Sequence, residues 1–86
     1  MIICAAIKDK RNGQIFCGIR HSDIYEMLYN LIYKIDAIEG FVDEENKFYG
    51  RLEAYDYVVE HYQLPRTVLE WKIEKHEREL YSEDLY

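Results

Sequence analysis

Apolar residues fall into two pairs of short runs that predict two β-hairpins. The runs at 2–8 and 14–19 flank Asn12-Gly13, which is a strong signal for a tight turn between antiparallel strands. A second hairpin is predicted within residues 40–49, where apolar and aromatic residues border a polar stretch. Its strands and turn are expected at 40–42, 47–49 and 43–46.

A helical repeat of apolar residues follows each predicted hairpin. After the first, Ser22 offers an N-cap, and apolar side chains recur at three- and four-residue steps as far as Ile35. After the second, apolar and aromatic residues line one side of a helix predicted over about 51–62, which the segment before Pro65 ends.

A third helix is predicted over residues 67–80. Thr67 and Glu70 fit a capping box, whereas the apolar residues of 69–73 alternate with charged ones as in a half-buried strand. The cap and the length of the segment favour the helix. Together these elements predict one α+β domain over residues 1–86, a small antiparallel sheet of two hairpins packed with two to three helices.

The chain carries a net charge of -6 over 86 residues, and the charge is unevenly distributed. Residues 1–21 are basic overall, and the later sequence is acidic. An acidic protein with one basic end is not expected to bind DNA or RNA, because such binding takes many phosphate contacts. A small anionic ligand held in a local basic pocket is compatible with this distribution.

Tyrosine is unusually frequent, with 9 residues in the chain. Tyr25, Tyr29 and Tyr33 fall at four-residue steps along the first predicted helix and so form a stripe beside its apolar face. A margin of the core is the simplest interpretation of this stripe, and a stacking wall or a subunit contact are the alternatives.

The sequence carries no sign of a membrane protein or a metalloprotein. No apolar run is long enough to span a bilayer, and the N-terminus lacks the basic region of a signal peptide, so a cytosolic protein is expected. Cys4 and Cys17 fall on adjacent predicted strands and are expected to be free buried thiols in a reducing compartment. With three scattered histidines they do not match the spacing of a metal site, and we expect no metal and no cofactor.

Catalytic signatures are weak. Cys17 and His21 are close in sequence, but a nucleophile also needs a base within hydrogen-bond reach and an oxyanion site, which the sequence does not define. The carboxylates occur in densely charged stretches typical of solvated surface, and no glycine-rich phosphate loop is present. We therefore expect a protein without enzymatic activity.

Two short basic segments are the best candidates for a binding site. Lys47 and Arg51 flank a predicted strand-to-helix junction, where the unpaired N–H groups of a helix start add to two positive side chains and favour a phosphate or diphosphate. Arg20 and His21 stand immediately before the first predicted helix, and the planar guanidinium of arginine suits phosphate recognition. Pairing with nearby carboxylates on an exposed surface is the alternative for both segments.

Short motifs occur along nearly the whole chain in the order found in one phage family. After an opening strand pair they are Gly18-Ile19-Arg20-His21-Ser22-Asp23, Gly40-Phe41, Lys47-Phe48-Tyr49-Gly50-Arg51-Leu52-Glu53-Ala54 and Ser82-Glu83-Asp84-Leu85-Tyr86. With this order the chain resembles the first class of phage Thoeris anti-defence proteins. Such proteins are sponges that bind and hide cyclic ADP-ribose-type signals without destroying them, so that the immune effector of the host stays inactive.

The resemblance implies a phage protein that sequesters a cyclic ADP-ribose-type or related cyclic nucleotide signal in the host cell cytoplasm. It also implies a homodimer or higher homo-oligomer with nucleotide sites at subunit junctions, in which Lys47 and Arg51 contact phosphate. Ile19, Lys47 and Gly50 depart from the family pattern, and the lysine keeps the charge but not the bidentate fork of an arginine. The remaining candidate ligand residues would hold phosphate or stack on a base: Arg20, His21, Phe48, Tyr25 and Tyr29.

A second hypothesis is a small phage protein-binding module. The sequence from residue 67 onward contains more acidic than basic residues, which suits a basic host protein and has no role in nucleotide binding. Under this hypothesis the acidic C-terminal segment and the tyrosine stripe dock on the host protein.

Overall fold

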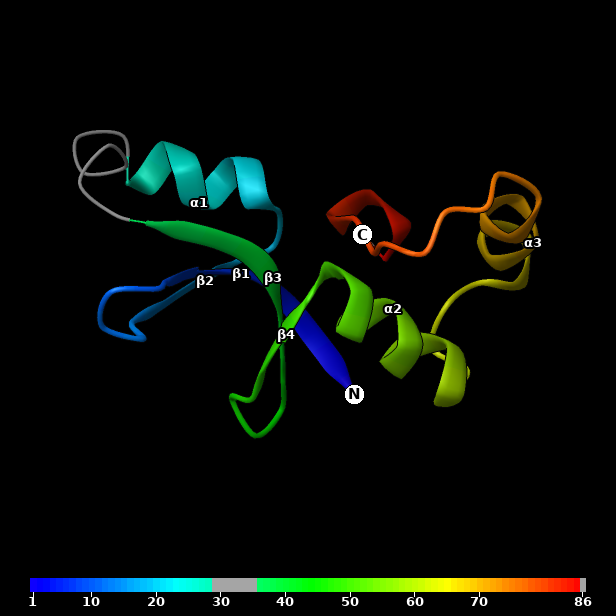
Figure 1. Ribbon diagram of the computed structural model, residues 1–86, viewed down its shortest axis with the longest axis horizontal. Coiled ribbons are helices and arrows are strands. Elements are labelled where there is room, and N and C mark those ends of the chain that lie inside the picture. Colours follow the sequence, from blue (N-terminus) through cyan, green and yellow to red (C-terminus); the bar gives the residue numbers. More distant parts are fainter. Residues whose placement is uncertain (29–35, 86) are drawn as a thin grey trace.

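The protein is built on a four-stranded antiparallel sheet (Figure 1). The computed structural model describes residues 1–28 and 36–85. Each hairpin supplies one half of the sheet, and β1 joins β3 at its centre, giving the order β2-β1-β3-β4. The predicted α+β class with two hairpins is confirmed. The strands are β1 Ile2–Asp9, β2 Ile15–Gly18, β3 Ala37–Asp43 and β4 Phe48–Gly50.

The β1–β2 hairpin turns where the sequence predicted. Gly13 has a φ of 74°, a left-handed conformation that glycine adopts without steric cost. The buried carboxylate of Asp9 organises this turn, because it accepts hydrogen bonds from the N–H groups of Arg11 at 3.0 Å and Asp36 at 3.3 Å. Hydrogen bonding from the Arg11 side chain, strengthened by these backbone bonds, holds the pKa of Asp9 below its usual range.

The carboxylate of Asp43 organises the turn of the β3–β4 hairpin in the same way. Its carboxylate accepts hydrogen bonds from the N–H of Glu45 at 2.9 Å, the N–H of Lys47 at 3.0 Å and the hydroxyl of Tyr49 at 2.9 Å. Burial raises the pKa of Asp43, but these hydrogen bonds outweigh burial and leave the pKa below its usual range.

Helical segments complete the described part of the chain: α1 His21–Met27, α2 Arg51–Glu60, α3 Arg66–Glu74 and a 3-10 turn, η2, Ser82–Asp84. α1 begins two residues before the position that a Ser22 cap predicted. Arg20 occupies the N-cap position without a side-chain bond to the helix, and the N–H of His21 donates to Ser82 Oγ at 3.3 Å. The rest of the predicted first helix, with Tyr29 and Tyr33, lies outside the described residues.

α3 differs from the prediction at its start. Pro65 holds the N-cap position, so Thr67 is already inside the helix and the predicted capping box is wrong. The carboxylate of Glu70 instead accepts a hydrogen bond at 3.1 Å from Nε of Arg66, one helical turn earlier. The alternative of a strand over residues 69–73 is excluded by this helix.

Both α2 and α3 end in a Schellman motif, in which a left-handed residue follows the helix. The left-handed residues are Tyr62, with a φ of 56°, and His76, with a φ of 57°. The motif ends α3 at Glu74, so the predicted end at residue 80 is wrong. The characteristic hydrogen bonds, each 2.8 Å long, run from the N–H of Gln63 to the carbonyl of Val58 and from the N–H of Glu77 to the carbonyl of Lys72.

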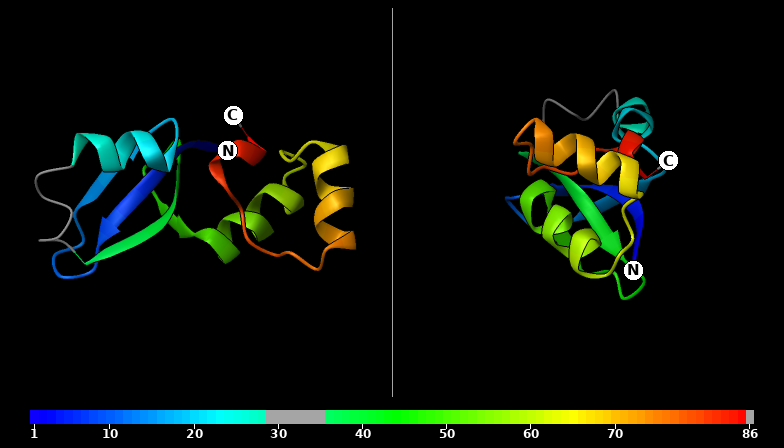
Figure 2. Two further views of the ribbon diagram at one scale, coloured as in Figure 1. Left: turned by 90° about the horizontal axis from the view of Figure 1, so that it is seen from above. Right: turned by 90° about the vertical axis from the view of Figure 1, so that its right-hand side faces the viewer.

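The core lies where the helices pack on one face of the sheet. Ala5, Ile7 and Phe41 share that face, because residues paired across neighbouring strands point the same way. They pack with Ile24 of α1 and Val58 of α2, and all of these side chains are fully buried. Figure 2 shows α1 lying along the strands, whereas α2 and α3 extend beyond one end of the sheet.

The other face of the sheet holds Gly40 and Phe48, because Phe48 pairs with Val42 rather than with Phe41. A β-carbon at Gly40 would collide with the carbonyl of Tyr49 and with the ring of Phe48. The absence of a side chain at this position therefore lets the Phe48 ring lie against the strand backbone. Nζ of Lys8 is 5.6 Å from the centre of the same ring.

Replacing Tyr62 by glycine should relieve the left-handed backbone at the end of α2. The side chain is 95% exposed, so its packing contributes little. We expect Tyr62→Gly to be more stable than Tyr62→Ala by about 0.5–1 kcal/mol, since the strain of a β-carbon there exceeds the extra chain entropy of glycine. Urea denaturation of both variants measures this difference, and equal midpoints would contradict it.

Candidate functional site

Arg51, one of the predicted ligand residues, opens α2 directly after β4. Its guanidinium donates to Glu39 Oε1 at 2.7 Å and to the carbonyl of Leu80 at 2.7 Å, and its central carbon lies 4.6 Å from the centre of the Tyr81 ring. The side chain is 19% exposed. Arg51 is thus a half-buried cation that is neutralised by a carboxylate from β3 and covered on one face by an aromatic ring.

Tyr25 of α1 contacts the same carboxylate. Burial raises the pKa of Tyr25, and the charge of Glu39 and a hydrogen bond to its carboxylate act in the same direction. Two predicted ligand residues, from helices far apart in sequence, therefore meet at Glu39. We call Tyr25, Glu39, Arg51 and Tyr81 the Glu39 cluster.

His21 lies beside the Glu39 cluster but faces inward. It is 6% exposed, and its ring packs edge-on against Phe41 with the ring centres 5.1 Å apart. Nε2 bonds to the carbonyl of Gly40 at 2.7 Å, so it carries the proton, and Nδ1 then accepts from the hydroxyl of Ser82 at 2.7 Å. Burial lowers the pKa of His21, and the positive charge of Arg51 lowers it further.

The contact between Ser82 and His21 has the atom types of a nucleophile and a base. Both residues are buried, however, and the second ring nitrogen is occupied by a backbone carbonyl. A nucleophile must reach a substrate atom, which an enclosed hydroxyl does not. The pair instead fastens the C-terminal segment to the start of α1.

A second buried cation holds the same segment. Lys72 of α3 is fully buried, and its Nζ lies 2.8 Å from Asp84 Oδ2 and 2.8 Å from the carbonyl of Glu79. Nζ is also 5.0 Å from the centre of the Tyr81 ring, which thus contacts both Lys72 and Arg51. A hydrogen bond to Glu77, with burial and Glu79, raises the pKa of Tyr81 to about 12.

Lys47 and Phe48 lie apart from the Glu39 cluster. Nζ of Lys47 is 5.1 Å from the ring centre of Tyr49, at the hairpin turn organised by the carboxylate of Asp43. Phe48 projects from the sheet face opposite to that of Phe41. Although Lys47 and Arg51 are close in sequence, their side chains have different partners in one protomer.

The other predicted residues complete this picture. Arg20 is exposed at the N-cap position of α1, next to His21. Tyr29 lies outside the described residues. The sequence interpretation missed Glu39 and the three residues that bring the C-terminal segment to the site: Tyr81, Ser82 and Asp84.

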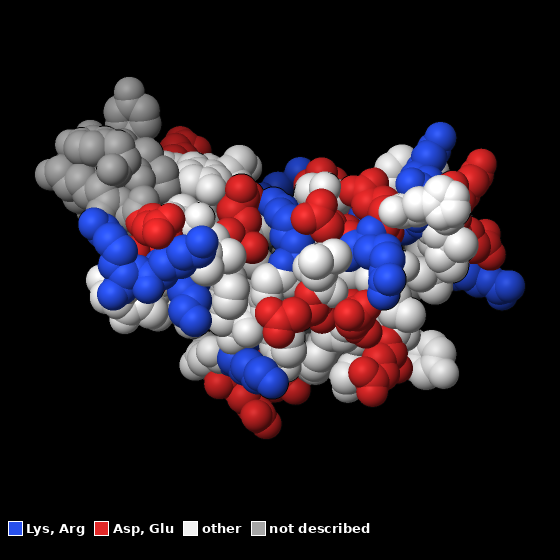
Figure 3. Space-filling model, viewed as in Figure 1, with Lys and Arg blue, Asp and Glu red and all other residues white. Residues whose placement is uncertain are grey.

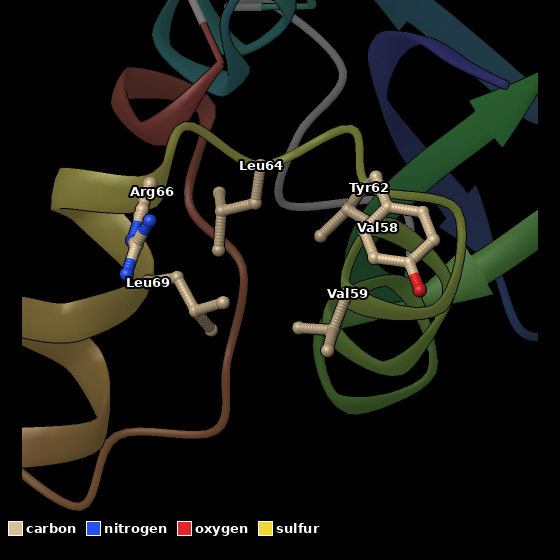
Figure 4. Close-up of a pocket in the computed structure, with 6 residues that line it drawn as sticks. All are labelled: Val58, Val59, Tyr62, Leu64, Arg66 and Leu69. Carbon is tan, nitrogen blue, oxygen red and sulfur yellow. The ribbon is translucent and has the colours of Figure 1, made fainter.

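A groove of about 440 Å³ lies between α2 and α3. Figure 4 shows apolar side chains from the two helices and from the loop between them facing the same space, with Arg66 at the edge. α3 also exposes half of Trp71 and 61% of Ile73, which lie on different sides of the helix because they are two residues apart. The groove is lined by Val58, Val59, Tyr62, Leu64, Arg66 and Leu69.

Surface charge separates along the molecule. Lys and Arg side chains gather near the β1–β2 turn, at the left of Figure 3, whereas Asp and Glu are prominent at the β3–β4 turn and over α2. Lys47 therefore belongs to an acidic turn that includes Asp43, Glu44 and Glu45. A phosphate at Lys47 alone would meet these carboxylates at close range.

Comparison with known proteins identifies a family. The model of a family described as phage T4 y16D protein matches residues 1–86. No curated protein and no solved structure matches the chain. Within residues 1–28 and 36–85, no helix is both long enough and apolar enough to cross a membrane.

The buried neutral ring of His21 should make folding sensitive to mild acid. Its folded-state pKa lies below the value of about 6.5 in an unfolded chain, so the unfolded state binds protons first as pH falls. The stability due to this ring is present above about pH 6.5 and is lost toward the lower folded-state pKa. NMR titration of His21 should give a midpoint below that of a free histidine peptide.

The matched control is His21→Gln, which cannot titrate. Its urea midpoint should fall less than that of the wild type between pH 7 and 5.5. A His21 midpoint equal to that of the free peptide would contradict the expectation.

Proposed function

We propose that this chain, which belongs to the phage T4 y16D protein family, is a non-enzymatic phage protein that sequesters a cyclic ADP-ribose-type or related cyclic nucleotide immune signal. It would hold the signal in the host cell cytoplasm without cleaving it. Two things support the proposal: the order of short motifs along the chain, and the convergence of candidate ligand residues on Glu39.

The convergence on Glu39 carries the proposal. Arg51 presents a guanidinium to a carboxylate, beside the phenol of Tyr25 and the ring of Tyr81. A phosphate has the same charge sign and suits the same donors, so it can replace Glu39 as the partner of Arg51. The two tyrosine rings offer surfaces on which a base can stack.

The positions of Lys47 and Phe48 favour a site shared between subunits. Phe48 faces away from the Glu39 cluster, and the Lys47 ammonium lies at the hairpin turn. In a homodimer or higher homo-oligomer, the hairpin of one subunit can bring these two side chains to the Glu39 cluster of another. Arg20, exposed beside His21, would then add a second guanidinium at the junction.

Calorimetry with the cyclic ADP-ribose isomers tests the ligand. We expect saturable binding by the wild type and a loss of at least about tenfold for Arg51→Met, because one charge-assisted hydrogen bond contributes about 1.5–3 kcal/mol. Arg66→Met is the matched control, since Arg66 is exposed and its guanidinium pairs with Glu70 on α3. Ligand released by heating the complex should be chemically intact.

Glu39→Gln provides an independent arm of the same test. It removes the charge that competes for Arg51 while keeping the shape of the side chain, so affinity for the ligand should rise. The absence of binding heat with every isomer, in wild-type protein shown to be folded by circular dichroism, would exclude the proposal. Recovery of cleaved ligand would indicate an enzyme instead.

A second candidate function is docking on a host protein. The observation that favours it is the apolar groove between α2 and α3, beside which Ile73 of α3 is exposed one helical turn after Leu69. Acidic residues are frequent in both helices and in the C-terminal segment, so a basic amphipathic partner segment would suit this end of the molecule.

Substitution on α3 tests docking better than truncation does. Removing residues 82–85 would take away the partners of His21 and Lys72 and leave a buried cation unpaired. We expect a host protein that co-purifies with the wild type to be lost with Ile73→Ser and retained with Met27→Ser, which alters a similarly exposed residue of α1. Retention by the Ile73→Ser variant would contradict docking at this surface.

A further inference from the structure

Cys4 and Cys17 lie on neighbouring strands and project from the same face of the sheet. Cys17 of β2 is directly opposite Ala6 of β1, and Cys4 is two residues before Ala6. Residues two apart on a strand share a face, so the two thiols are diagonal neighbours across the antiparallel pair. Cys4 pairs on its other side with Val42, away from the face that carries the core.

The thiols differ in accessibility. Both are free, as expected from the sequence, but the expected burial is wrong for Cys17, which is exposed, while Cys4 is half-buried. Burial raises the pKa of Cys4 to about 11, and the neighbouring thiol of Cys17, to which it is hydrogen-bonded, adds to this effect. The two thiols are therefore neighbours, with one open to solvent and the other half-buried.

We propose that Cys4 and Cys17 are a redox-active pair that closes to a cross-strand disulfide when the protein meets an oxidised low-molecular-weight thiol. The inference does not depend on the function proposed above. It rests on the strand register, which makes the two thiols diagonal neighbours on one face, and on the exposure of Cys17.

The reaction balances as two successive thiol–disulfide exchanges. The exposed Cys17 thiolate attacks one sulfur of the small disulfide, which forms a mixed disulfide and releases one small thiolate. Cys4 then loses its proton to solvent and attacks the sulfur of Cys17, which releases the second small thiolate. The protein gives up two electrons and the small disulfide takes them up.

The local structure allows the small movement that closure needs. Diagonal neighbours are slightly farther apart than an unstrained disulfide requires. β2 is a four-residue edge strand, and the pairing of β1 with β3 is irregular between Ile2 and Cys4. The edge strand β2 can therefore move toward Cys4 while the central strand β1 keeps its place in the core.

Because Cys4 is mostly protonated near neutral pH, the second exchange should be the slower step and should accelerate about tenfold per pH unit up to pH 9.

The test uses the reduced full chain and glutathione disulfide, followed by intact-mass spectrometry. The wild type should lose two hydrogen atoms and keep no glutathione, with a linked Cys4–Cys17 peptide after digestion and full reversal by dithiothreitol. Cys4→Ser should stop at a stable glutathione adduct on Cys17, and Cys17→Ser should react much more slowly. At a fixed ratio of glutathione to glutathione disulfide, the closed fraction at equilibrium should be larger in the folded protein than in urea at about 8 M, which unfolds small domains, because unfolding separates the thiols.

Two results would overturn the proposal. One is a wild type that accumulates the same stable glutathione adduct as Cys4→Ser. The other is a closed fraction that is no larger in the folded protein than in urea, since the strand register that brings the two thiols together would then confer no advantage.

Discussion

The fully buried ammonium group of Lys72 is the constraint on which the second half of the fold depends. Burying a cation away from water lowers the free energy of unfolding by several kcal/mol unless the cation is paired and hydrogen-bonded. Asp84 and the carbonyl of Glu79 meet that requirement, and to do so the chain after α3 must return toward the sheet. This return places Leu80 in the core and carries the C-terminal segment to Arg51 and the start of α1.

The course of the chain after α3 also determines the surroundings of Arg51 and His21. In the sequence they stand out as positive or titratable groups at helix starts in an acidic chain. In the folded protein the guanidinium shares a carboxylate with Tyr25, and the imidazole is enclosed with both nitrogens bonded. Any anion that binds at Arg51 therefore competes with Glu39. Its binding free energy is the difference between the interaction of Arg51 with the anion and the interaction of Arg51 with Glu39.

Local chemistry explains which parts could be predicted from the sequence. The two hairpins could be predicted because Gly13 marks the first turn and polar residues border the apolar runs that form the strands. The helix α2 could be predicted from its apolar repeat. The end of α3 could not be predicted in this way, because a histidine takes the left-handed position that glycine usually signals. The strand-like alternation of 69–73 likewise arises because α3 exposes two apolar residues, Trp71 and Ile73, on different sides of the helix.

For the candidate site, sequence proximity was a poor guide to spatial proximity. Lys47 and Arg51 are separated by a short strand and find different partners, whereas His21 and Ser82 meet from opposite ends of the chain. Glu39 gave no signal of its own, since it stands just before the strand predicted over 40–42, and a lone carboxylate becomes informative only when its cross-sheet neighbours are known.

Trp71 has a consequence of a different kind. It is the single tryptophan and is half exposed on α3. Its emission therefore reports on the surroundings of that helix surface and only weakly on the packing of the core, so a spectral shift at constant fold would be an optical sign that something has covered α3.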